Sequence, residues 1–347
     1  MYKTILFSDT HLKNNESIGR IDNNGNSLMT MKKLSHIATV IDYAIASNAD
    51  SIIIAGDLFD TPNPSNKIKS MLSKIFSKAI KNKINIYIIG GNHETTDNKY
   101  YNLMSESSYS NFLHFVKNQS ITTEDGIYIK LISSGQEHTI EKIQVLTPTI
   151  LIGHFQIEGA KYDNERLCTD FIPQSLLHKF KKVYCGHFHK RQIKNNWMYI
   201  GALCRNNFGE ADNVSGFMEL IIKNGEINEK FVPVDDIKFK VISLEDEIES
   251  EDDILNAISN SIKGNNAYKF IFKIPEGMKV HRRRIRDYAY SLNPFHVSIE
   301  YEYIKDKSIY SISKEFNYME AILEYSKYKK MTKKLTKIGI NIAKEIF

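Results

Sequence analysis

Short apolar runs, each followed at once by polar residues, recur along the first two thirds of the chain. Five of these runs have the length and composition of β-strands and span residues 4–7, 51–55, 84–89, 150–152 and 183–185. Between the first three runs, residues 31–47 and 68–80 carry apolar side chains at helical spacing. We therefore predict that strands and helices alternate in an α/β fold.

The pattern changes after two further runs, at 217–222 and 230–234, which flank Asn224-Gly225 and read as a closing hairpin. We place the end of a first domain there, at residues 1–235. A second, small α/β domain is predicted at 236–304, with strand and helix segments at 238–243, 251–261, 269–274, 280–291 and 296–303. Residues 305–347 have apolar side chains at helical spacing with lysines between them, which predicts two helices. Their apolar stripes either pack back on the chain or dock a partner.

Each of the five strands is followed by a short motif of polar residues with functional chemistry. In chain order the motifs are Asp9-x-His11, Gly56-Asp57-x-x-Asp60, Gly91-Asn92-His93-Glu94, Gly153-His154 and Gly186-His187-x-His189. In an open α/β sheet the loops beyond the strand ends converge on one crevice. The sequence therefore predicts that carboxylates, an amide and several imidazoles meet at one metal site.

The number of donors favours two metal ions over one. The candidate ligands are Asp9, His11, Asp57, Asn92, His154, His187 and His189. A single ion takes about four to six ligands, some of them water or substrate. Two ions that share a bridging carboxylate fit this set better, and such pairs serve in-line phosphoryl displacement. Nitrogen and oxygen donors without thiolate suit Mn²⁺ or Fe²⁺ at least as well as Zn²⁺.

Position along the chain suggests a role for several of these residues. Asp57 follows the most uniformly apolar strand and is the natural bridging carboxylate. His93 is expected to face the substrate and protonate the leaving oxygen, and Asp60 to orient it through a hydrogen bond. A lone His or Asp after a strand is more often a helix cap or a solvated loop residue. The presence of five such motifs in one order argues against that interpretation. The remaining non-enzymatic alternative is an inactive scaffold that binds metal.

These motifs resemble those of the calcineurin-like metallophosphoesterase superfamily, whose pattern is D-x-H, GD-x-x-D, GNH-D/E, GH and GH-x-H. The residues around the ligands narrow the resemblance to the nuclease subunit of double-strand-break repair complexes, a family that includes bacterial SbcD and the recombination endonuclease subunit of large tailed phages. The segments that carry it are Asp9-Thr10-His11-Leu12, Gly56-Asp57-Leu58-Phe59-Asp60, Gly186-His187-Phe188-His189 and Tyr199-Ile200-Gly201. Glu94 stands where the family usually has aspartate, and no ligand is missing.

The resemblance implies a four-layer β-sandwich flanked by helices, with a small α/β capping, DNA-binding domain at 236–304 and a C-terminal helical hairpin at 305–347. It also implies two Mn²⁺ ions, with Mg²⁺ or Fe²⁺ as alternatives. One ion would be held by Asp9, His11, Asp57 and His189, and the other by Asp57, Asn92, His154 and His187. His93 would be the catalytic acid.

The activity implied by the resemblance is Mn²⁺-dependent hydrolysis of DNA, as a 3′-to-5′ exonuclease on duplex ends and an endonuclease on single strands. A Rad50/SbcC-like ATPase would grip the C-terminal helices, and a helical stretch around residues 100–115 would join two copies as a homodimer. A small-molecule phosphodiesterase or phosphoprotein phosphatase of the same superfamily is the alternative. The capping domain and the helical tail count against it, because a small substrate needs neither.

Composition adds limits on compartment and partners. The chain has 347 residues, 42% of them hydrophobic, and no apolar run long enough to cross a membrane. Cys168, Cys185 and Cys204 are odd in number and lack metal-binding spacing, which predicts free buried thiols in a reducing compartment, the cytoplasm (the host's, if phage-encoded). A net charge of +5 permits DNA binding without requiring it. The basic run at 281–286 is either a solvated helix face or a contact to the DNA backbone.

Overall fold

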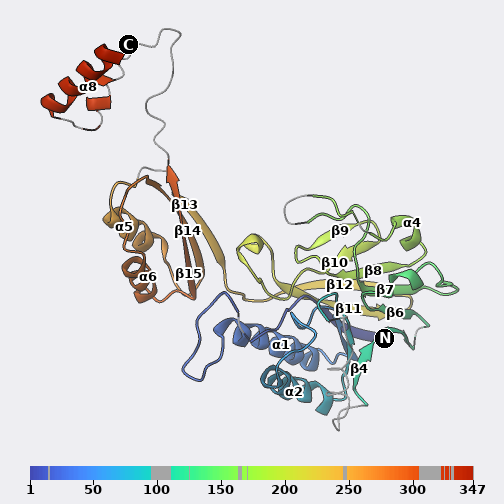
Figure 1. The fold of residues 1–347 in the computed structure, drawn as a ribbon. Coiled ribbons are helices and arrows are strands. Elements are labelled where there is room, and N and C mark those ends of the chain that lie inside the picture. Colours follow the sequence, from blue (N-terminus) through green and yellow to red (C-terminus); the bar gives the residue numbers. More distant parts are fainter. Residues whose placement is uncertain are drawn as a thin grey trace.

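The computed structural model describes residues 1–14, 16–94, 111–124, 126–162, 166–169, 171–244, 248–304, 322–323, 325–327, 329 and 332–346. The strands form two six-stranded sheets and one three-stranded sheet (Figure 1). No helix in the described part of the chain combines the length and the apolar character that crossing a bilayer requires.

The first sheet contains the strands that precede the first three motifs. Its order is β12 (Glu226–Pro233), β11 (Gly216–Lys223), β1 (Tyr2–Phe7), β2 (Ser51–Ala55), β3 (Asn85–Ile89) and β4 (Leu113–Val116). Strands β1 to β4 run parallel, whereas β11 pairs antiparallel with β1 and forms the predicted hairpin with β12. The helix expected around 100–115 is wrong for residues 113–115, which belong to β4 because they pair with β3. Residues 100–110 lie outside the described residues.

The second sheet contains the strands that precede the last two motifs. Its order is β5 (Asn118–Thr122), β6 (Tyr128–Ile132), β7 (Thr149–His154), β8 (Lys182–Gly186), β10 (Trp197–Tyr199) and β9 (Gln192–Lys194). Strands β6, β7, β8 and β10 are parallel. Side chains from both sheets, among them Ile53 and Ile152, meet in one buried apolar layer. The two sheets therefore form a sandwich.

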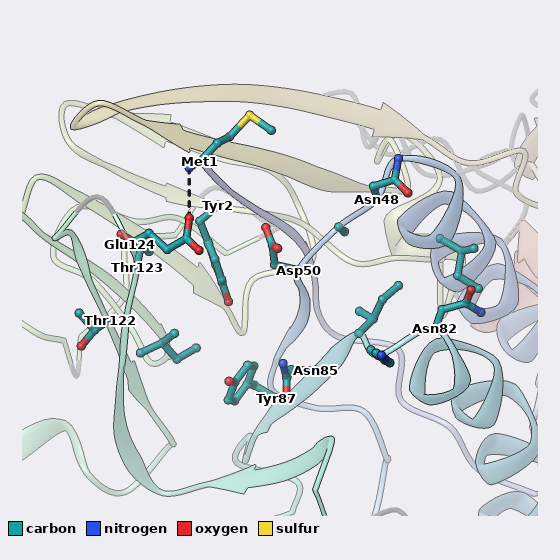
Figure 2. A pocket seen from close by; sticks show the side chains of 15 residues that line it. Met1, Tyr2, Asn48, Asp50, Asn82, Asn85, Tyr87, Thr122, Thr123 and Glu124 are labelled. Carbon is teal, nitrogen blue, oxygen red and sulfur yellow. Dashed lines mark ion pairs between the residues drawn. The ribbon is translucent and has the colours of Figure 1, made fainter.

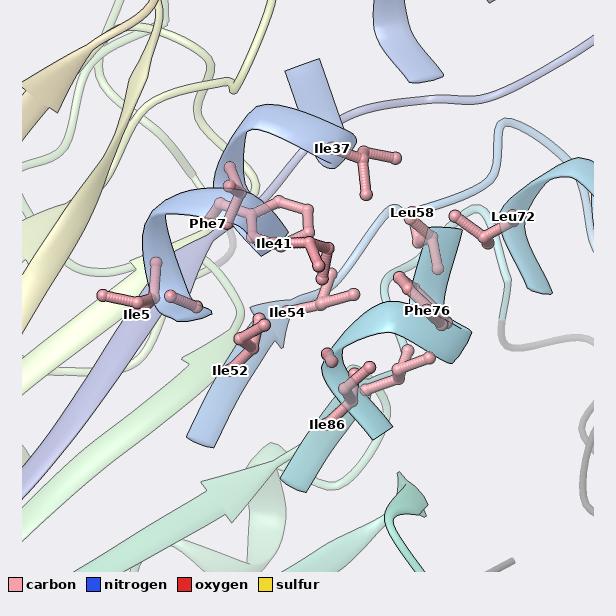
Figure 3. Close-up of a cluster of buried hydrophobic side chains, with 14 of the residues drawn as sticks. Ile5, Phe7, Ile37, Ile41, Ile52, Ile54, Leu58, Leu72, Phe76 and Ile86 are labelled. Atoms are coloured by element: carbon pink, nitrogen blue, oxygen red, sulfur yellow. The ribbon is translucent and has the colours of Figure 1, made fainter. Parts of the chain in front are cut away.

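Helices cover the outer face of the first sheet. Figure 3 shows α1 (Leu28–Ala46) and α2 (Asn66–Lys81) packed on β1, β2 and β3 through a cluster that includes Ile52 and Ile54. Ile53, between them, faces the second sheet. Because both faces of β2 are covered, every one of its residues is buried, which explains the apolar run that follows Ser51.

The outer face of the second sheet is covered by α4 (Gln174–Leu177) and by loops whose apolar residues pack on β7, β8 and β10. The four layers are therefore α1 and α2, the first sheet, the second sheet, and α4 with its neighbouring loops. The predicted four-layer α/β sandwich is confirmed. Two short 3₁₀ helices, η1 (Glu137–Thr139) and η2 (Phe208–Glu210), lie in the loops. Cys168, Cys185 and Cys204 are buried and free, as predicted.

The third sheet consists of three parallel strands, β13 (Phe239–Leu244), β14 (Ala267–Pro275) and β15 (His296–Ile304). Helices α5 (Glu251–Ser261) and α6 (Arg282–Ser291) pack on one face of it through a separate core. The start of this unit rests on the sandwich, because Phe239 and Phe295 pack with Ile18 and Met29. The third sheet is thus seated against the chain that links β1 to α1.

The described part of the C-terminal segment is helical. A Cβ added at Gly339 of α8 (Lys333–Ile346) would lie 3.4 Å from Ile322 Cγ2, so α8 packs closely on the helical residues around 322. Leu335, Ile338 and Ile342 of α8 stay 50%, 46% and 51% exposed. In Figure 1, α8 lies apart from the three sheets. Part of the predicted stripe, Phe316 and Met319, falls outside the described residues.

Candidate metal centre

The five motifs lie at the carboxyl ends of β1, β2, β3, β7 and β8, four of them in or entering the loop that follows and Gly153-His154 as the last two residues of β7. Main-chain hydrogen bonds join the first two loops, from Asp9 N to Gly56 O at 3.1 Å and from His11 N to Asp57 O at 2.9 Å. A third bond, from Leu12 N to Leu58 O at 2.9 Å, continues the ladder. The first carboxylate–imidazole pair is therefore held in a fixed register beside Asp57.

Four candidate ligands adopt left-handed backbone conformations. The φ angle is +54° at Asp9, +49° at His11, +49° at Asp57 and +96° at His187. This region is uncommon for residues other than glycine, and such strain clusters at functional sites. The loops thus turn sharply where their donor side chains converge.

One half of the centre joins the first, second and fifth motifs. His11 Nε2 lies 3.0 Å from His189 Nε2 and 3.6 Å from Asp57 Oδ2. Asp9, His11 and His189 present donor atoms within 4.8 Å of one another and could hold a metal ion together. All of these side chains are buried or half-buried.

The other half joins the second, third, fourth and fifth motifs. His154 Nε2 lies 2.9 Å from Asn92 Oδ1 and 3.4 Å from Asp57 Oδ2. His187 Nδ1 lies 3.0 Å from the same Asn92 oxygen. The main-chain N–H of His187 donates to the Asp9 carboxylate at 3.0 Å, which ties this half to the first. The structure therefore brings all seven sequence-predicted ligands together, with Asp57 between the two halves.

The donor set fits divalent metal ions. Imidazole nitrogens face one another and face carboxylate and amide oxygens, with no thiolate among them, which is the ligand chemistry of Mn²⁺, Fe²⁺ or Zn²⁺. Glycines clear space for these donors. A Cβ at Gly91 would lie 1.9 Å from Asp57 Oδ1, and one at Gly56 would lie 2.2 Å from His154 Nδ1. The loops can therefore hold their ligands only because these positions lack side chains.

The clustered groups shift one another's protonation. Burial alone would raise the pKa of Asp57, but His154 and His11 beside it hold that pKa well below its usual range. Burial disfavours the cationic form of His154, yet the Asp57 and Asp9 carboxylates raise its pKa to about 9. Desolvation and the adjacent His154 lower the pKa of His187 to about 4. His187 is thus neutral at neutral pH, the form in which imidazole binds a metal.

Three residues outside the motifs form hydrogen bonds with the candidate ligands. The carboxylate of buried Glu210, in η2, lies 2.8 Å from His189 Nδ1. Gln156 Nε2 lies 3.1 Å from His187 Nε2. The buried ammonium of Lys33, in α1, donates to the His11 carbonyl at 2.9 Å. None of the three belongs to a motif or to a recognisable spacing, so the sequence alone does not identify them.

His93 differs from the ligands in being accessible, with a side chain 42% exposed. Its main-chain N–H donates to Asp57 Oδ1 at 3.1 Å, so the residue is anchored to the centre. His93 Nδ1 lies 3.2 Å from the main-chain oxygen of Asp60 and 3.9 Å from its carboxylate. The hydrogen bond expected from the Asp60 side chain is thus made by its main chain. The carboxylate instead faces His11 Nδ1 at 3.3 Å and Lys13 Nζ at 3.1 Å.

Glu94 braces two ligand loops. Its fully buried carboxylate accepts hydrogen bonds from Phe59 N at 2.8 Å and Gly91 N at 2.9 Å. Burial raises the pKa of this carboxyl to about 7. The longer glutamate at this position therefore links the loop after β2 to the loop after β3.

A cavity of about 510 Å³ lies at the other ends of the same strands (Figure 2). Tyr2, Asp50 and Asn85, at the amino ends of β1, β2 and β3, line it, and the Met1 ammonium meets Glu124 there at 3.8 Å. Its described lining includes none of the motif residues. The donor cluster and this cavity therefore lie at opposite ends of the strands of the first sheet.

Comparison with known proteins agrees with the chemistry of the centre. The model of the calcineurin-like phosphoesterase family matches residues 2–191. SbcD, one of the subunits of the nuclease SbcCD, from Staphylococcus epidermidis, is 29% identical in an alignment of 264 positions that covers 65% of this chain and 68% of that protein.

Two solved structures are also similar. A dimetal phosphatase from Danio rerio has a TM-score of 0.47 and 8% identity, over 66% of this chain and 95% of that one. A purple acid phosphatase from yellow lupin has a TM-score of 0.41 and 15% identity, over 66% of this chain and 51% of that one. The family match spans more than half of the 347 residues and contains all five motifs. The chain belongs to the calcineurin-like phosphoesterase family, a family of metal-dependent hydrolases.

Proposed function

We propose that this protein is the Mn²⁺-dependent nuclease subunit of an SbcCD-like DNA repair or recombination complex. The observation that carries the proposal is the convergence of the seven candidate donors with an accessible imidazole, His93, anchored beside Asp57. The likeness to the SbcD protein of SbcCD supports DNA as the substrate. The activities would be 3′-to-5′ exonuclease on duplex ends and endonuclease on single strands.

We assign one metal position to Asp9, His11, Asp57 and His189, and the other to Asp57, Asn92, His154 and His187. When bound, two divalent ions supply Lewis acidity toward the phosphate and toward water. The protein's part is to fix the donors. Its main-chain ladder between the first two loops, and the buried Lys33 and Glu210, restrict where the donors can move.

His93 would act as the general acid. A proton on Nδ1 donates to the Asp60 main-chain oxygen, which leaves Nε2 to deliver the second proton of the imidazolium to the leaving oxygen. Its exposure gives a substrate access to the ring. His93 also forms a triad with His11 and Asp57 that could hold an ion, so its role must be separated from that of a ligand.

We further propose that residues 1–235 form the nuclease domain and 236–304 a capping domain that binds DNA. Residues 305–347 would dock a Rad50/SbcC-like ATPase. The apolar side chains of α8 support this docking role, because the described residues leave about half of Leu335, Ile338 and Ile342 exposed. A homodimer remains part of the proposal, and the segment expected to form it lies largely outside the described residues.

The test compares three substrates with the purified protein and its His93→Ala variant. End-labelled linear duplex, a single-stranded circle and a generic aryl phosphodiester are incubated with Mn²⁺, Mg²⁺ or chelator, while calorimetry measures Mn²⁺ binding. We expect Mn²⁺-dependent DNA cleavage that falls about 10²- to 10⁴-fold in the variant, the range for loss of a general acid. Mn²⁺ stoichiometry should stay unchanged.

Two outcomes would contradict the proposal, one for the role of His93 and one for the substrate. Loss of one Mn²⁺ per chain in His93→Ala would make His93 a ligand and remove its role as acid. Cleavage of the aryl ester with intact DNA, even with an ATPase partner added, would show a small-molecule phosphodiesterase.

A further inference from the structure

The 3₁₀ helix η2 contacts both the metal centre and the third sheet. Glu210, at its end, is 1% exposed, and its carboxylate lies 2.8 Å from His189 Nδ1. Phe208, at its start, packs edge-on against the ring of Phe239 in β13, with centroids 5.1 Å apart and planes at 75°. One turn of three residues therefore reaches a candidate metal ligand through one side chain and the third sheet through another.

Hydrogen bonds within this turn fix the Glu210 carboxylate. It accepts from Asn206 N at 2.8 Å and from Asn207 Nδ2 at 2.6 Å. The side-chain oxygen of Asn207 in turn accepts from Gly209 N at 2.8 Å and caps η2. Because the carboxylate is bound to the start of its own turn, a displacement of the turn moves the carboxylate with it.

The other side of the turn is packed against the third sheet. Phe208 and Ala211 pack on an apolar cluster that includes Phe239 and Phe295, each of which is 4% exposed. The Phe208 ring also lies near the ring of His296 in β15, with centroids 6.2 Å apart and planes at 39°. The position of η2 thus depends on where β13 and β15 are seated.

A second segment holds the third sheet on the sandwich. A Cβ at Gly19 would lie 3.1 Å from Phe295 Cε1, and Arg20 Nη2 donates to Asn293 Oδ1 at 3.1 Å. Gly19 and Arg20 belong to the chain between β1 and α1, after the first motif. The third sheet therefore contacts the segments that follow the first and the fifth motifs, which both supply donors to one half of the centre.

We propose that Phe208 is a positioning residue for the metal centre, through which the docked third sheet holds Glu210 where it orients His189. A carboxylate at one imidazole nitrogen directs the other nitrogen to a metal. The third sheet then sets the Mn²⁺ affinity of one of the two positions. Since such coupling is reciprocal, Mn²⁺ binding also tightens the seating of β13. The inference rests on the metal positions of the proposed function and not on its substrate.

A local structural role for Phe208 makes a different prediction. If the sandwich alone fixed η2, loss of the Phe208 ring would lower the stability of the chain and leave Mn²⁺ affinity unchanged. Phe239→Ala removes the same ring contact from the side of the third sheet. Tyr288 of α6 is half-buried in the separate core of the third sheet, so Tyr288→Ala is a matched control for loss of an aromatic side chain there.

The experiment titrates Mn²⁺ into the full chain by isothermal titration calorimetry, with circular dichroism to verify that each variant is folded. We expect Phe208→Ala and Phe239→Ala each to weaken one of the two Mn²⁺ sites about 2- to 30-fold, the range for residues that modulate coupling. The double variant should be no weaker than the weaker single variant, because both substitutions remove one contact. Phe208→Leu should regain most of the affinity, and Tyr288→Ala should bind like wild type.

Hydrogen exchange measures the reciprocal effect. Mn²⁺ should slow exchange of the main-chain amides of β13 in wild type, and this slowing should be absent in Phe208→Ala. A wild type whose β13 exchanges equally with and without bound Mn²⁺ would overturn the coupling.

The titrations separate this inference from the proposed function. Wild-type affinity in both Phe208→Ala and Phe239→Ala would overturn the inference and leave the metal centre intact. Weakening in Phe208→Ala alone would confine the effect to η2 and exclude the third sheet, and equal weakening in Tyr288→Ala would show general destabilisation in place of positioning. If wild type binds no Mn²⁺, the metal centre of the proposed function fails, and the inference fails with it.

Discussion

Glu210 holds His189 from the side away from the other donors. Its carboxylate lies 2.8 Å from His189 Nδ1 and also accepts from Asn206 N at 2.8 Å. An acceptor at Nδ1 keeps the proton there and directs Nε2 to a metal. We expect Glu210→Gln to weaken Mn²⁺ affinity about 10- to 100-fold, as measured by isothermal titration calorimetry.

Glu219→Gln is the matched control for this prediction. Glu219 is also buried, on β11, but its partners are Lys3 Nζ at 3.6 Å and the Tyr43 hydroxyl at 3.1 Å, away from the donors. That variant should bind Mn²⁺ like wild type. Equal affinity in both variants would show that Glu210 does not position His189.

Some residues of the metal centre can be identified from the sequence, whereas others are recognised only once the folded structure shows their contacts. Asp9, His154 and the other donors belong to motifs whose residue types and order already specify metal chemistry. Glu210 and Gln156 act on those donors from loops with no motif of their own, 21 and 31 residues from the histidines they contact. Their contacts arise from how η2 and the loop after β7 pack, so neighbouring residues in the chain give no signal for them.

At the scale of elements, the turn after β2 must pass close to the end of β7. Gly56 has φ +90°, and a Cβ there would lie 2.2 Å from His154 Nδ1. Gly277 has the same φ of +90°, with nothing within 4 Å of its Cβ position. Gly56→Ala should displace His154 and abolish Mn²⁺ binding at its position. Gly277→Ala should cost only about 1 to 2 kcal/mol of folding free energy, measured by urea unfolding, and keep Mn²⁺ binding.

If Gly277→Ala lost Mn²⁺ as fully as Gly56→Ala, the left-handed backbone alone would explain both results. The close approach to His154 would then have no separate effect.

The junction between β12 and β13 depends on a buried carboxylate. Asp236 accepts from Arg205 N at 2.8 Å and Ser215 Oγ at 2.9 Å, and lies 3.0 Å from His36 Nε2 in α1. Burial would raise its pKa, but these hydrogen bonds lower it. A depressed carboxyl pKa stabilises the fold above the unfolded value of about 3.9, and that stability is lost as pH falls through the folded pKa.

Asp236→Asn should therefore destabilise the protein at pH 7 by about 3 kcal/mol, the cost of breaking a buried pair. The difference from wild type should shrink as the pH falls below 4. Chemical denaturation at several pH values measures both. A difference that stays constant down to pH 3 would show that Asp236 does not act through its charge.

Apolar runs predicted the elements that have both faces buried, but missed β5 and β9 at the two edges of the second sheet. β2 is buried at every position, and α5 begins and ends where its helical spacing predicts. β5 is exposed or half-exposed throughout, and β9 has three such residues, so neither shows an apolar run. Residues 113–116 form a strand by pairing with the edge of β3.

At the scale of the whole molecule, the two halves of the sandwich each supply part of the centre. Loops from the first sheet bring Asp57 and Asn92, and the second sheet brings His154, at the end of β7, and His187, in the loop after β8. Neither sheet alone contains the seven donors, so the layer between the sheets that includes Ile53 and Ile152 also fixes the distance between them. The order of motifs predicted their convergence, whereas the spacing of the two halves required the packed sandwich.

The C-terminal helices stand outside this arrangement and give the last prediction. Leu335, Ile338 and Ile342 are each about half exposed on α8, although three such side chains at helical spacing normally find cover. We expect a Leu335→Asp/Ile342→Asp variant to lose binding to an SbcC-like ATPase in a pull-down assay. Its melting temperature and Mn²⁺ affinity should match wild type, because α8 packs on residues around 322 and not on the sandwich. Lysines at 334 and 337 changed to glutamine supply a control of equal charge change on the same helix. If that control loses the ATPase as well, charge and not the apolar stripe is what the partner binds.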